Sequence, residues 1–398
     1  APSIVEDAIK KEVNCVHFFT SGFAEVATEE GIALQKKIVD LVKGKIRLIG
    51  PNCMGIYNPK MKIAFDQRQS STIGNAGFVS QSGGLAIMFS ENGEQEGNYC
   101  SKVISIGNSC DLKLTDFLEY FSEDEETKTI GMYIEGLGDN EGEKFIDILR
   151  RTTRRKPVLI WKSGQTEAGA RAASSHTGAM ASGYQMWQTL AKQFGVILVD
   201  SIEEMHDFIK LYRMIPPPKS TKSCIVALGG GNSVTFTDVC AKGGIELDEL
   251  QKETQEGLLE FIPPMGTIRR NPVDLSGGAY GPNVVENSLK LIGRDKNIDS
   301  VIFIFEARFM VNRADRFGGD PQKIVDNQVA GIVAARDELK VPLVCNNPIV
   351  IEDMAVEELR QYLKKELENN NVPSFRTIER TIKALRRYNE YYNFLNGY

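Results

Sequence analysis

The chain of 398 residues exceeds one ordinary domain of about 100 to 200 residues, so we expect two or three domains. Hydrophobic residues make up 42% and charged residues 25%, which is ordinary for a folded protein and argues against long disorder. The net charge of −6, with Lys and Arg spread along the chain, argues against a nucleic-acid partner. No apolar run approaches a membrane span and no signal pattern is seen, so we expect a cytoplasmic protein without a membrane partner.

Short apolar runs alternate with helical patterns along the chain, which predicts an α/β fold of several Rossmann-like or flavodoxin-like doubly wound parallel-sheet domains. Each run is followed by glycine or a polar residue, as expected of a strand buried on both faces. The predicted strands, in chain order, are 13–19, 46–49, 76–79, 130–134, 158–161, 196–199, 224–228, 301–305 and 341–345. A helix over 201–214 opens with Ser201 and Glu204 in a capping-box pattern.

Two breaks interrupt this alternation. The proline-rich stretch 215–219 is typical of a linker, and the polar segment 66–75 interrupts the α/β pattern. We therefore predict domains at 1–68, 69–217 and 218–398. The first is too small to close a doubly wound sheet alone, so we expect it to be the C-terminal part of a Rossmann-like domain whose front is missing.

One histidine lies in a loop of small and hydroxyl-bearing residues over 162–183. This is His176, and the neighbouring Ser175 and Thr177 supply hydroxyls for oxygens arriving on the ring. A histidine can attack phosphorus because its pKa of about 6.5 leaves one ring nitrogen free at neutral pH. The alternative is an exposed loop histidine without a role. A metal site is disfavoured because no short, regular ligand spacing is present, and His17 and His206 lie in structural settings.

A nucleophilic histidine needs an acceptor on its second ring nitrogen, and a carboxylate at a strand end is the usual solution. Glu135 ends the predicted strand 130–134 and precedes Gly136, so it should emerge at the carboxyl edge of the sheet, where ligands bind in this architecture. The alternative is a solvated acid at a strand end.

A phosphoryl group that is carried on a histidine also needs an anion-binding site. The Ser82-Gly83-Gly84 turn follows the predicted strand 76–79 and begins a helix, which aims backbone N–H groups and the helix dipole at an anion. A glycine turn that serves packing is the alternative. The glycine turns at 229–231 and 276–278 follow strands too, but we assign them no role.

Three motifs together closely resemble the second domain of the NDP-forming acyl-CoA synthetase superfamily, which includes succinyl-CoA synthetase and ADP-forming acetyl-CoA synthetase. They are Gly-Phe-Val-Ser-Gln-Ser-Gly-Gly at 77–84, Tyr-Ile-Glu-Gly at 133–136 and Ser-His-Thr-Gly-Ala at 175–179. Upstream, 21–25 and 50–55 look like the closing half of that family's CoA-binding domain. Downstream, 229–231 and 271–274 are similar to the extra ligase domain of the acetyl-CoA synthetase branch. The resemblance covers nearly the whole chain.

The resemblance implies an ADP-forming acid–CoA ligase that converts acid, CoA and ATP into acyl-CoA, ADP and phosphate through acyl phosphate and phosphohistidine intermediates. The acid would be a short-chain carboxylate, with or without a hydroxyl group. The implied catalytic residues are His176, which is phosphorylated, and Glu135, which holds it. The implied phosphate-binding residues are Ser82, Gly83, Gly84, Ser175, Thr177 and Gly178. Ser21, Gly22 and Asn52 would face CoA or substrate, and no metal site is assigned.

No ATP-grasp domain and no Walker-type loop can be identified in the sequence. The family therefore implies a partner domain or subunit of the ATP-grasp type, which binds the nucleotide with Mg²⁺, and we expect an oligomer. One alternative is a CoA-binding regulatory or scaffold module without turnover, which would need none of the three motifs. An enzyme like ATP-citrate lyase would need a helical domain like citrate synthase, whereas the last third of the chain is α/β in pattern.

Overall fold

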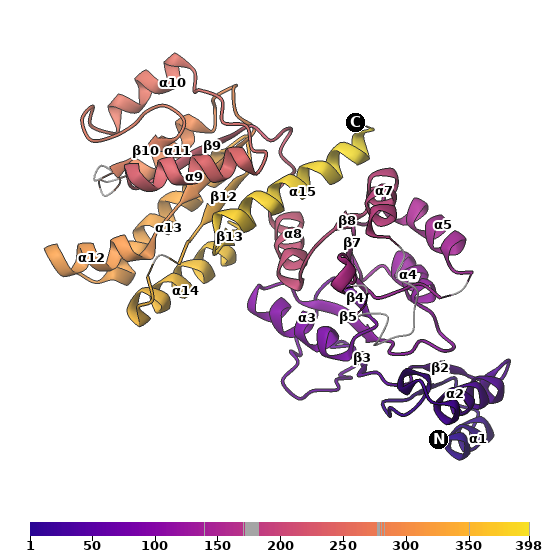
Figure 1. The fold of residues 1–398 in the computed structure, drawn as a ribbon. Coiled ribbons are helices and arrows are strands. Elements are labelled where there is room, and N and C mark those ends of the chain that lie inside the picture. The colour runs from indigo at the N-terminus through magenta and orange to yellow at the C-terminus, as the bar shows by residue number, and fades with distance from the viewer. Residues whose placement is uncertain are drawn as a thin grey trace. The chain divides into compact units, whose positions relative to one another are not determined.

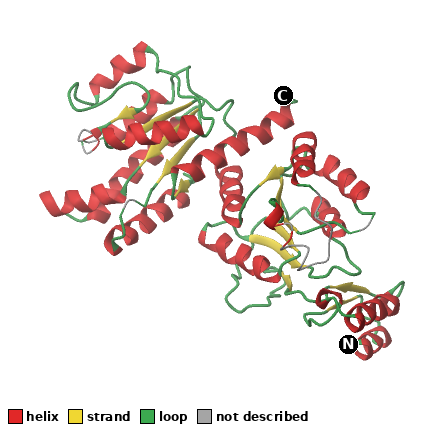
Figure 2. Ribbon diagram, viewed as in Figure 1, coloured by secondary structure: helices red, strands yellow, loops and turns green. Residues whose placement is uncertain are grey.

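The computed structural model describes residues 1–138, 140–169, 171, 183–276, 279, 281, 283–349 and 351–397. These residues form two compact units, unit 1 over Ala1–Ile209 and unit 2 over Lys210–Asn396. Figure 1 labels their helices and strands along the chain, and Figure 2 shows that each unit combines strands with flanking helices.

Unit 1 begins with a small parallel sheet, in which β1 (Cys15–His17) pairs with β2 (Arg47–Ile49). Its helices are α1 (Pro2–Lys10), the short η1 (Ala24–Val26) and α2 (Glu29–Val42). The side chain of Thr28 caps α2 by accepting a hydrogen bond from the Gly31 N–H at 3.1 Å. The buried core consists of Val5, Phe18, Phe23, Ile38, Val42, Ile46 and Leu48.

The larger sheet of unit 1 has six strands in the order β3-β5-β4-β6-β7-β8. The strands are β3 (Gly55–Tyr57), β4 (Ala76–Ser80), β5 (Cys100–Ser105), β6 (Thr129–Ile134), β7 (Val158–Lys162) and β8 (Ile197–Leu198). All neighbours are parallel except β3, which runs antiparallel to β5 at the edge. The helices are α3 (Gly83–Gln95), α4 (Leu114–Glu123), α5 (Gly142–Thr152) and α7 (Tyr184–Phe194), and α8 (Ile202–Met214) begins in unit 1 and ends in unit 2. Buried Val, Ile, Met, Phe and Trp side chains fill the layers, as expected of a sheet covered on both faces.

Unit 2 contains a parallel sheet of five strands in the order β10-β9-β11-β12-β13. The strands are β9 (Ser223–Ala227), β10 (Val273–Asp274), β11 (Ser300–Ile304), β12 (Leu343–Asn346) and β13 (Ser374–Phe375). The helices are α9 (Gly230–Lys242), α10 (Lys252–Gly257), the short η2 (Leu258–Glu260), α11 (Val284–Ile292), α12 (Ala307–Phe317), α13 (Pro321–Glu338), α14 (Met354–Asn369) and α15 (Ile378–Asn396). One continuous apolar core lies between the sheet, η2 and helices α11 to α14.

The predicted α/β class with doubly wound parallel sheets is confirmed, and each of the nine predicted strands is present with shifted ends. The predicted helix at 201–214 is α8, capped as expected: the Glu204 N–H donates to the Ser201 hydroxyl at 3.2 Å. Strands β3, β5, β10 and β13 were not predicted. The domain boundaries near 68 and 217 stay predictions; β3 lies before the first of them and pairs with β5.

The seven cysteines are free thiols, of which Cys15 is exposed, Cys110 is half-buried and the other five are buried. Within the described ranges, no helix combines the length and apolar character that crossing a bilayer requires.

Candidate functional site

The six-stranded sheet has a topological switch point at β4. The next strand in the chain, β5, lies on one side of β4, and β6 lies on the other. In such sheets the loops that follow the two strands at the switch point, here β4 and β6, leave in different directions. A crevice forms beyond the carboxyl ends of these strands, and ligands bind there. After β4 the chain passes through Ser82 to Gly83 and Gly84, which begin α3, and β6 leads directly into Glu135. The structure therefore brings these two predicted features, more than fifty residues apart in sequence, to the same edge of the sheet.

Ser82 is the N-cap of α3, and its hydroxyl accepts a hydrogen bond from the Leu85 N–H at 3.4 Å. The first-turn N–H groups of a helix have no intrahelical acceptor, so this end attracts anions. Gly83 allows a close approach, because a Cβ there would lie 2.5 Å from the Met54 Cγ. Gly84 is exposed, and a Cβ there would meet nothing within 4 Å, so the helix start is open to a ligand on that side.

Glu135 lies one residue beyond the end of β6 and is half-buried. A side chain from the neighbouring loop contacts it, since Gln81 Oε1 accepts hydrogen bonds from the N–H groups of Glu135 and Gly136 at 2.6 and 3.2 Å. Two residues earlier on the same strand, burial raises the pKa of the Tyr133 hydroxyl, and the charge of Glu135 raises it further. Tyr133 therefore stays protonated and can donate to a carboxylate.

The loop with the predicted histidine leaves the end of β7, the strand next to β6. Ser175, His176, Thr177 and Gly178 lie outside the described residues, and the description resumes at Gly183, the N-cap of α7. The other two histidines are in structural positions. His206 is buried with its ring 4.4 Å from the Phe89 ring, and burial lowers the pKa of His17 on β1.

Ser21, Gly22 and Asn52 lie at a junction between the small sheet and the larger sheet of unit 1. Glu25 accepts hydrogen bonds from the Gly22 N–H at 2.6 Å and from the Asn108 side chain at 2.5 Å. Asn108 Oδ1 in turn accepts from the side chain of Asn52 at 3.4 Å. Burial alone would raise the pKa of Glu25, but these hydrogen bonds lower it below its usual value. Asn108 therefore links Gly22 and Asn52 within one network.

The loop that carries Asn108 depends on Gly107 for this contact. Gly107 has a φ of +50°, and a Cβ there would lie 2.1 Å from the Pro51 backbone oxygen. Only glycine allows two chain segments to approach so closely. The sequence reasoning missed Gly107 and Asn108, because each contacts a segment more than fifty residues away and no local pattern marks either residue.

Unit 2 has a polar edge of its own, at the carboxyl ends of its strands. Asp274 ends β10, Glu306 follows β11, and Asn346 and Asn347 end and follow β12, and all four are buried. The Asp274 carboxylate accepts from the Ser276 N–H and hydroxyl, each at 2.9 Å. The sequence reasoning assigned no role to this edge. Its signal was the one that indicated Glu135, namely a polar residue directly after a buried strand.

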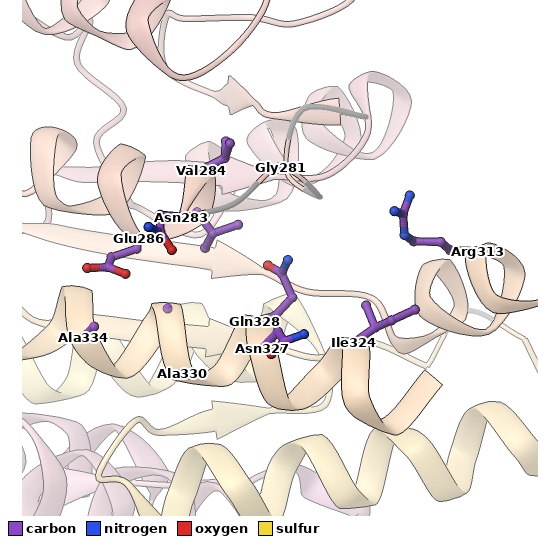
Figure 3. A pocket seen from close by; sticks show the side chains of 12 residues that line it. Gly281, Asn283, Val284, Glu286, Arg313, Ile324, Asn327, Gln328, Ala330 and Ala334 are labelled. Carbon is purple, nitrogen blue, oxygen red and sulfur yellow. The ribbon is translucent and has the colours of Figure 1, made fainter. Parts of the chain in front are cut away.

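A groove of about 690 Å³ lies in unit 2 between α11, α12 and α13. Figure 3 shows the side chains of Asn327, Gln328 and Ile324 on α13 and of Arg313 on α12 around it. None of the predicted site residues lines this groove. Among the residues that the structure describes, no group of three or more His, Cys, Asp and Glu side chains could hold a metal ion.

Two family comparisons match separate parts of the chain. Residues 73–212 match the succinyl-CoA ligase like flavodoxin domain, and residues 223–376 match the ligase-CoA domain. Acetyl-coenzyme A synthetase 1 (dinucleotide forming) of Ca. Korarchaeum cryptofilum, solved in complex with phosphate and ADP, superposes with a TM-score of 0.82 at 27% identity. That alignment covers 99% of this chain and 81% of the solved chain.

Two similar relatives carry named activities. The chain is 36% identical over 296 residues to acetate–CoA ligase [ADP-forming] II subunit alpha of Pyrococcus furiosus, which covers 74% of this chain and 64% of the relative. It is 33% identical over 305 residues to 4-hydroxybutyrate–CoA ligase [ADP-forming] of Nitrosopumilus maritimus. That alignment covers 75% of this chain and 43% of the relative. The chain thus spans less than two thirds of each of these relatives. With its succinyl-CoA ligase-like and ligase-CoA domains, the chain belongs to the ADP-forming acyl-CoA synthetase family.

Proposed function

We propose that this chain is the CoA-ligase and phosphohistidine part of an ADP-forming acid–CoA ligase. The reaction is acid + CoA + ATP = acyl-CoA + ADP + phosphate. The observation that supports it most is the meeting of the α3 N-terminus, at Ser82-Gly83-Gly84, with Glu135 at one switch-point crevice, beside the strand that leads into the His176 loop. A helix start supplies anion-binding N–H groups, and a nearby carboxylate can orient an imidazole.

In the direction of ATP formation, phosphate attacks the thioester carbonyl of acyl-CoA, the C–S bond breaks, and acyl phosphate and CoA result. A ring nitrogen of His176 then attacks the phosphorus, and the P–O bond to the acyl group breaks to release the carboxylate. The phosphohistidine finally transfers the phosphoryl group to ADP. Histidine suits this role because it is a fair nucleophile and a good leaving group for phosphorus.

Each residue has one task in this scheme. Glu135 accepts a hydrogen bond from the ring N–H of His176, which leaves the other ring nitrogen free to attack. The α3 N-terminus, with Ser175, Thr177 and Gly178, holds the phosphoryl oxygens. Ser21, Gly22 and Asn52 contact CoA or the acyl group, and hydrogen bonds through Glu25 and Asn108 join the segments that carry Gly22 and Asn52.

An ATP-grasp domain or subunit would bind the nucleotide with Mg²⁺, and the relative from Pyrococcus furiosus is itself named a subunit alpha. The acid is a short-chain carboxylate, and acetate and 4-hydroxybutyrate are the first to test because those relatives are named for them. We also propose a cytoplasmic oligomer.

The test is phosphorylation of the chain by radiolabelled ATP in the presence of its ATP-grasp partner, or by acyl phosphate alone. The expected label is stable to base and labile to acid, as a phosphohistidine is, and it is absent from His176→Asn. A label that persists in His176→Asn would sink the proposal. If CoA binds while wild type takes up no label, the chain is instead a CoA-binding regulatory or scaffold module without turnover.

A further inference from the structure

The backbone of Glu135 is held on both sides by side chains. The β4–β6 ladder ends at the pair Ser80 and Tyr133, and the β6–β7 ladder ends at the pair Ile134 and Lys162. Glu135 thus lies just past both ladders, where strand pairing no longer fixes the backbone. Its position must come from other contacts.

Gln81 provides the first of these contacts across the crevice, from the loop after β4. Its Oε1 lies 2.6 Å from the Glu135 nitrogen, and its Nε2 donates to the Gly136 oxygen at 3.0 Å. One amide side chain therefore bonds to two consecutive residues of the opposite loop. This arrangement replaces the next rungs of the β4–β6 ladder and fixes the width of the crevice.

Lys162 provides the second contact, from the end of β7. Its ammonium donates to the backbone oxygens of Glu135 at 2.9 Å and Ser163 at 2.5 Å, and it lies 6.0 Å from the centre of the Trp187 ring. The residue is only 2% exposed. Burying an ammonium group is costly unless its donors are satisfied, so a buried lysine at this edge requires a reason.

We infer that Gln81 and Lys162 are positioning residues that fix Glu135 for its contact with the histidine ring, an inference that rests on the function proposed above. Together they hold the N–H and the C=O of Glu135, which sets the direction in which its side chain leaves the backbone. A carboxylate that orients a reacting ring must be held within about 0.5 Å. Neither residue needs to touch the substrate, because both act through Glu135.

The chain offers a matched control for Lys162 at the other end of the same strand. Lys156 precedes β7 and is 8% exposed, and its ammonium donates to the backbone oxygens of Phe121 at 2.8 Å and Asp124 at 2.7 Å. Lys156 and Lys162 are thus both buried lysines that bond to two carbonyl oxygens. They differ in which edge of the sheet they occupy.

The experiment measures the phosphorylation rate and the steady-state constants of the full enzyme, with its ATP-grasp partner, for Lys162→Met, Gln81→Met and Lys156→Met. Lys162→Met and Gln81→Met should lower the phosphorylation rate and kcat at least about tenfold, as loss of such supporting contacts does. The KM values for CoA and nucleotide should stay within about twofold, because binding groups are untouched. Lys156→Met should lower the melting temperature as Lys162→Met does, yet keep the phosphorylation rate.

A double-mutant cycle separates positioning from a general structural effect. If Lys162 acts through Glu135, then Lys162→Met should cause no further loss in a Glu135→Gln enzyme, whereas independent structural damage would multiply the two losses. Gln81→Glu keeps the acceptor for the Glu135 N–H but places an anion against the Gly136 oxygen, so it should not restore the rate lost in Gln81→Met.

The inference for Lys162 would be overturned if the rate losses of Lys162→Met and Glu135→Gln multiply in the double mutant. It would also be overturned if Lys156→Met lowers the phosphorylation rate as much as Lys162→Met does. A wild-type rate in Gln81→Met would overturn it for Gln81, which is half-buried in the loop after β4. These outcomes leave the proposed function intact as long as wild type is labelled. Failure of wild type to label would count against the function itself.

Discussion

Asn271 offers a sharp test of how unit 2 is held together. Its Oδ1 accepts from the Ile225 N–H at 3.1 Å, and its Nδ2 donates to the backbone oxygens of Ser223 at 2.8 Å and Asp248 at 2.9 Å. The side chain thus extends the β9–β10 ladder, which has only two residue pairs of its own, Val273 with Val226 and Asp274 with Ala227. Asn271→Ala removes three hydrogen bonds at about 1 kcal/mol each, so unit 2 should lose about 2 to 3 kcal/mol of unfolding free energy.

The two units can be followed separately, because both tryptophans, Trp161 and Trp187, lie in unit 1. Far-UV circular dichroism reports on both units, and tryptophan fluorescence reports on unit 1. During urea unfolding, Asn271→Ala should shift the circular dichroism transition to lower urea while the fluorescence transition stays. The melting temperature of unit 2 should fall by about 5 to 10 °C, as expected for a unit of this size.

Two further variants complete this test. Asn271→Asp keeps the acceptor but turns a donor amide into an anion facing two carbonyl oxygens, so it should destabilise at least as much as alanine. Asn327→Ala, at an exposed position on α13, should stay within about 0.5 kcal/mol of wild type. An Asn271→Ala protein as stable as the Asn327→Ala control would refute the assignment of the three bonds as structural.

Three other predictions follow from single contacts. Gly107→Ala places a Cβ 2.1 Å from a backbone oxygen, so it should cost unit 1 more than about 2 kcal/mol in urea unfolding. Burial raises the pKa of Cys53 to about 11, so at pH 8 only about one thiol in a thousand is ionised. Iodoacetamide should therefore modify the exposed Cys15 and leave Cys53 intact, as read by mass spectrometry. Hydrogen bonding to Arg360 lowers the pKa of Glu357 from 4.5 to about 2. The stabilisation that the ionised Glu357 contributes is therefore present above pH 4.5 and is lost as the pH falls toward 2. Glu357→Gln should flatten the pH dependence of the urea midpoint of unit 2 over that range.

Strands could be predicted from the sequence where a continuous apolar run indicates that the strand is buried. The run 130–134 is apolar throughout, and it forms a central strand, whereas β5 is just as buried but contains Ser101, Lys102 and Ser105. Lys102 is tolerated there because its ammonium pairs with Asp124 at 2.9 Å and Glu126 at 2.8 Å. These partners lie more than twenty residues away, so no local pattern predicts the strand. Strands β10 and β13 have two residues each, too few for any periodicity.

Some residues of the candidate site can be predicted from the sequence and others cannot, for the same reason. A polar residue that ends a buried run, such as Glu135, can be found from sequence because the rule is local. Gln81, Asn108 and Lys162 cannot be found in this way, because each acts through hydrogen bonds to a segment that is distant in sequence or to a neighbouring strand end. Glutamine, asparagine and lysine are also common surface residues, so their type alone carries no signal.

The topology explains why the distant motifs meet at one edge of the six-stranded sheet. β4 comes first among the five parallel strands, and β5 and β6 are added on its opposite sides, so the loops after β4 and β6 leave in different directions. A crevice opened in this way has no backbone pairing across it, and its width would vary unless side chains cross it. The Gln81 side chain crosses the crevice to bond to the Glu135 N–H, and Lys162 bonds to the Glu135 backbone oxygen from β7. The geometry at Glu135 therefore depends on two side chains that can be changed by mutation. A module that only bound CoA would gain nothing from a buried ammonium group at this edge, whereas a carboxylate that must orient an imidazole ring gains a fixed direction.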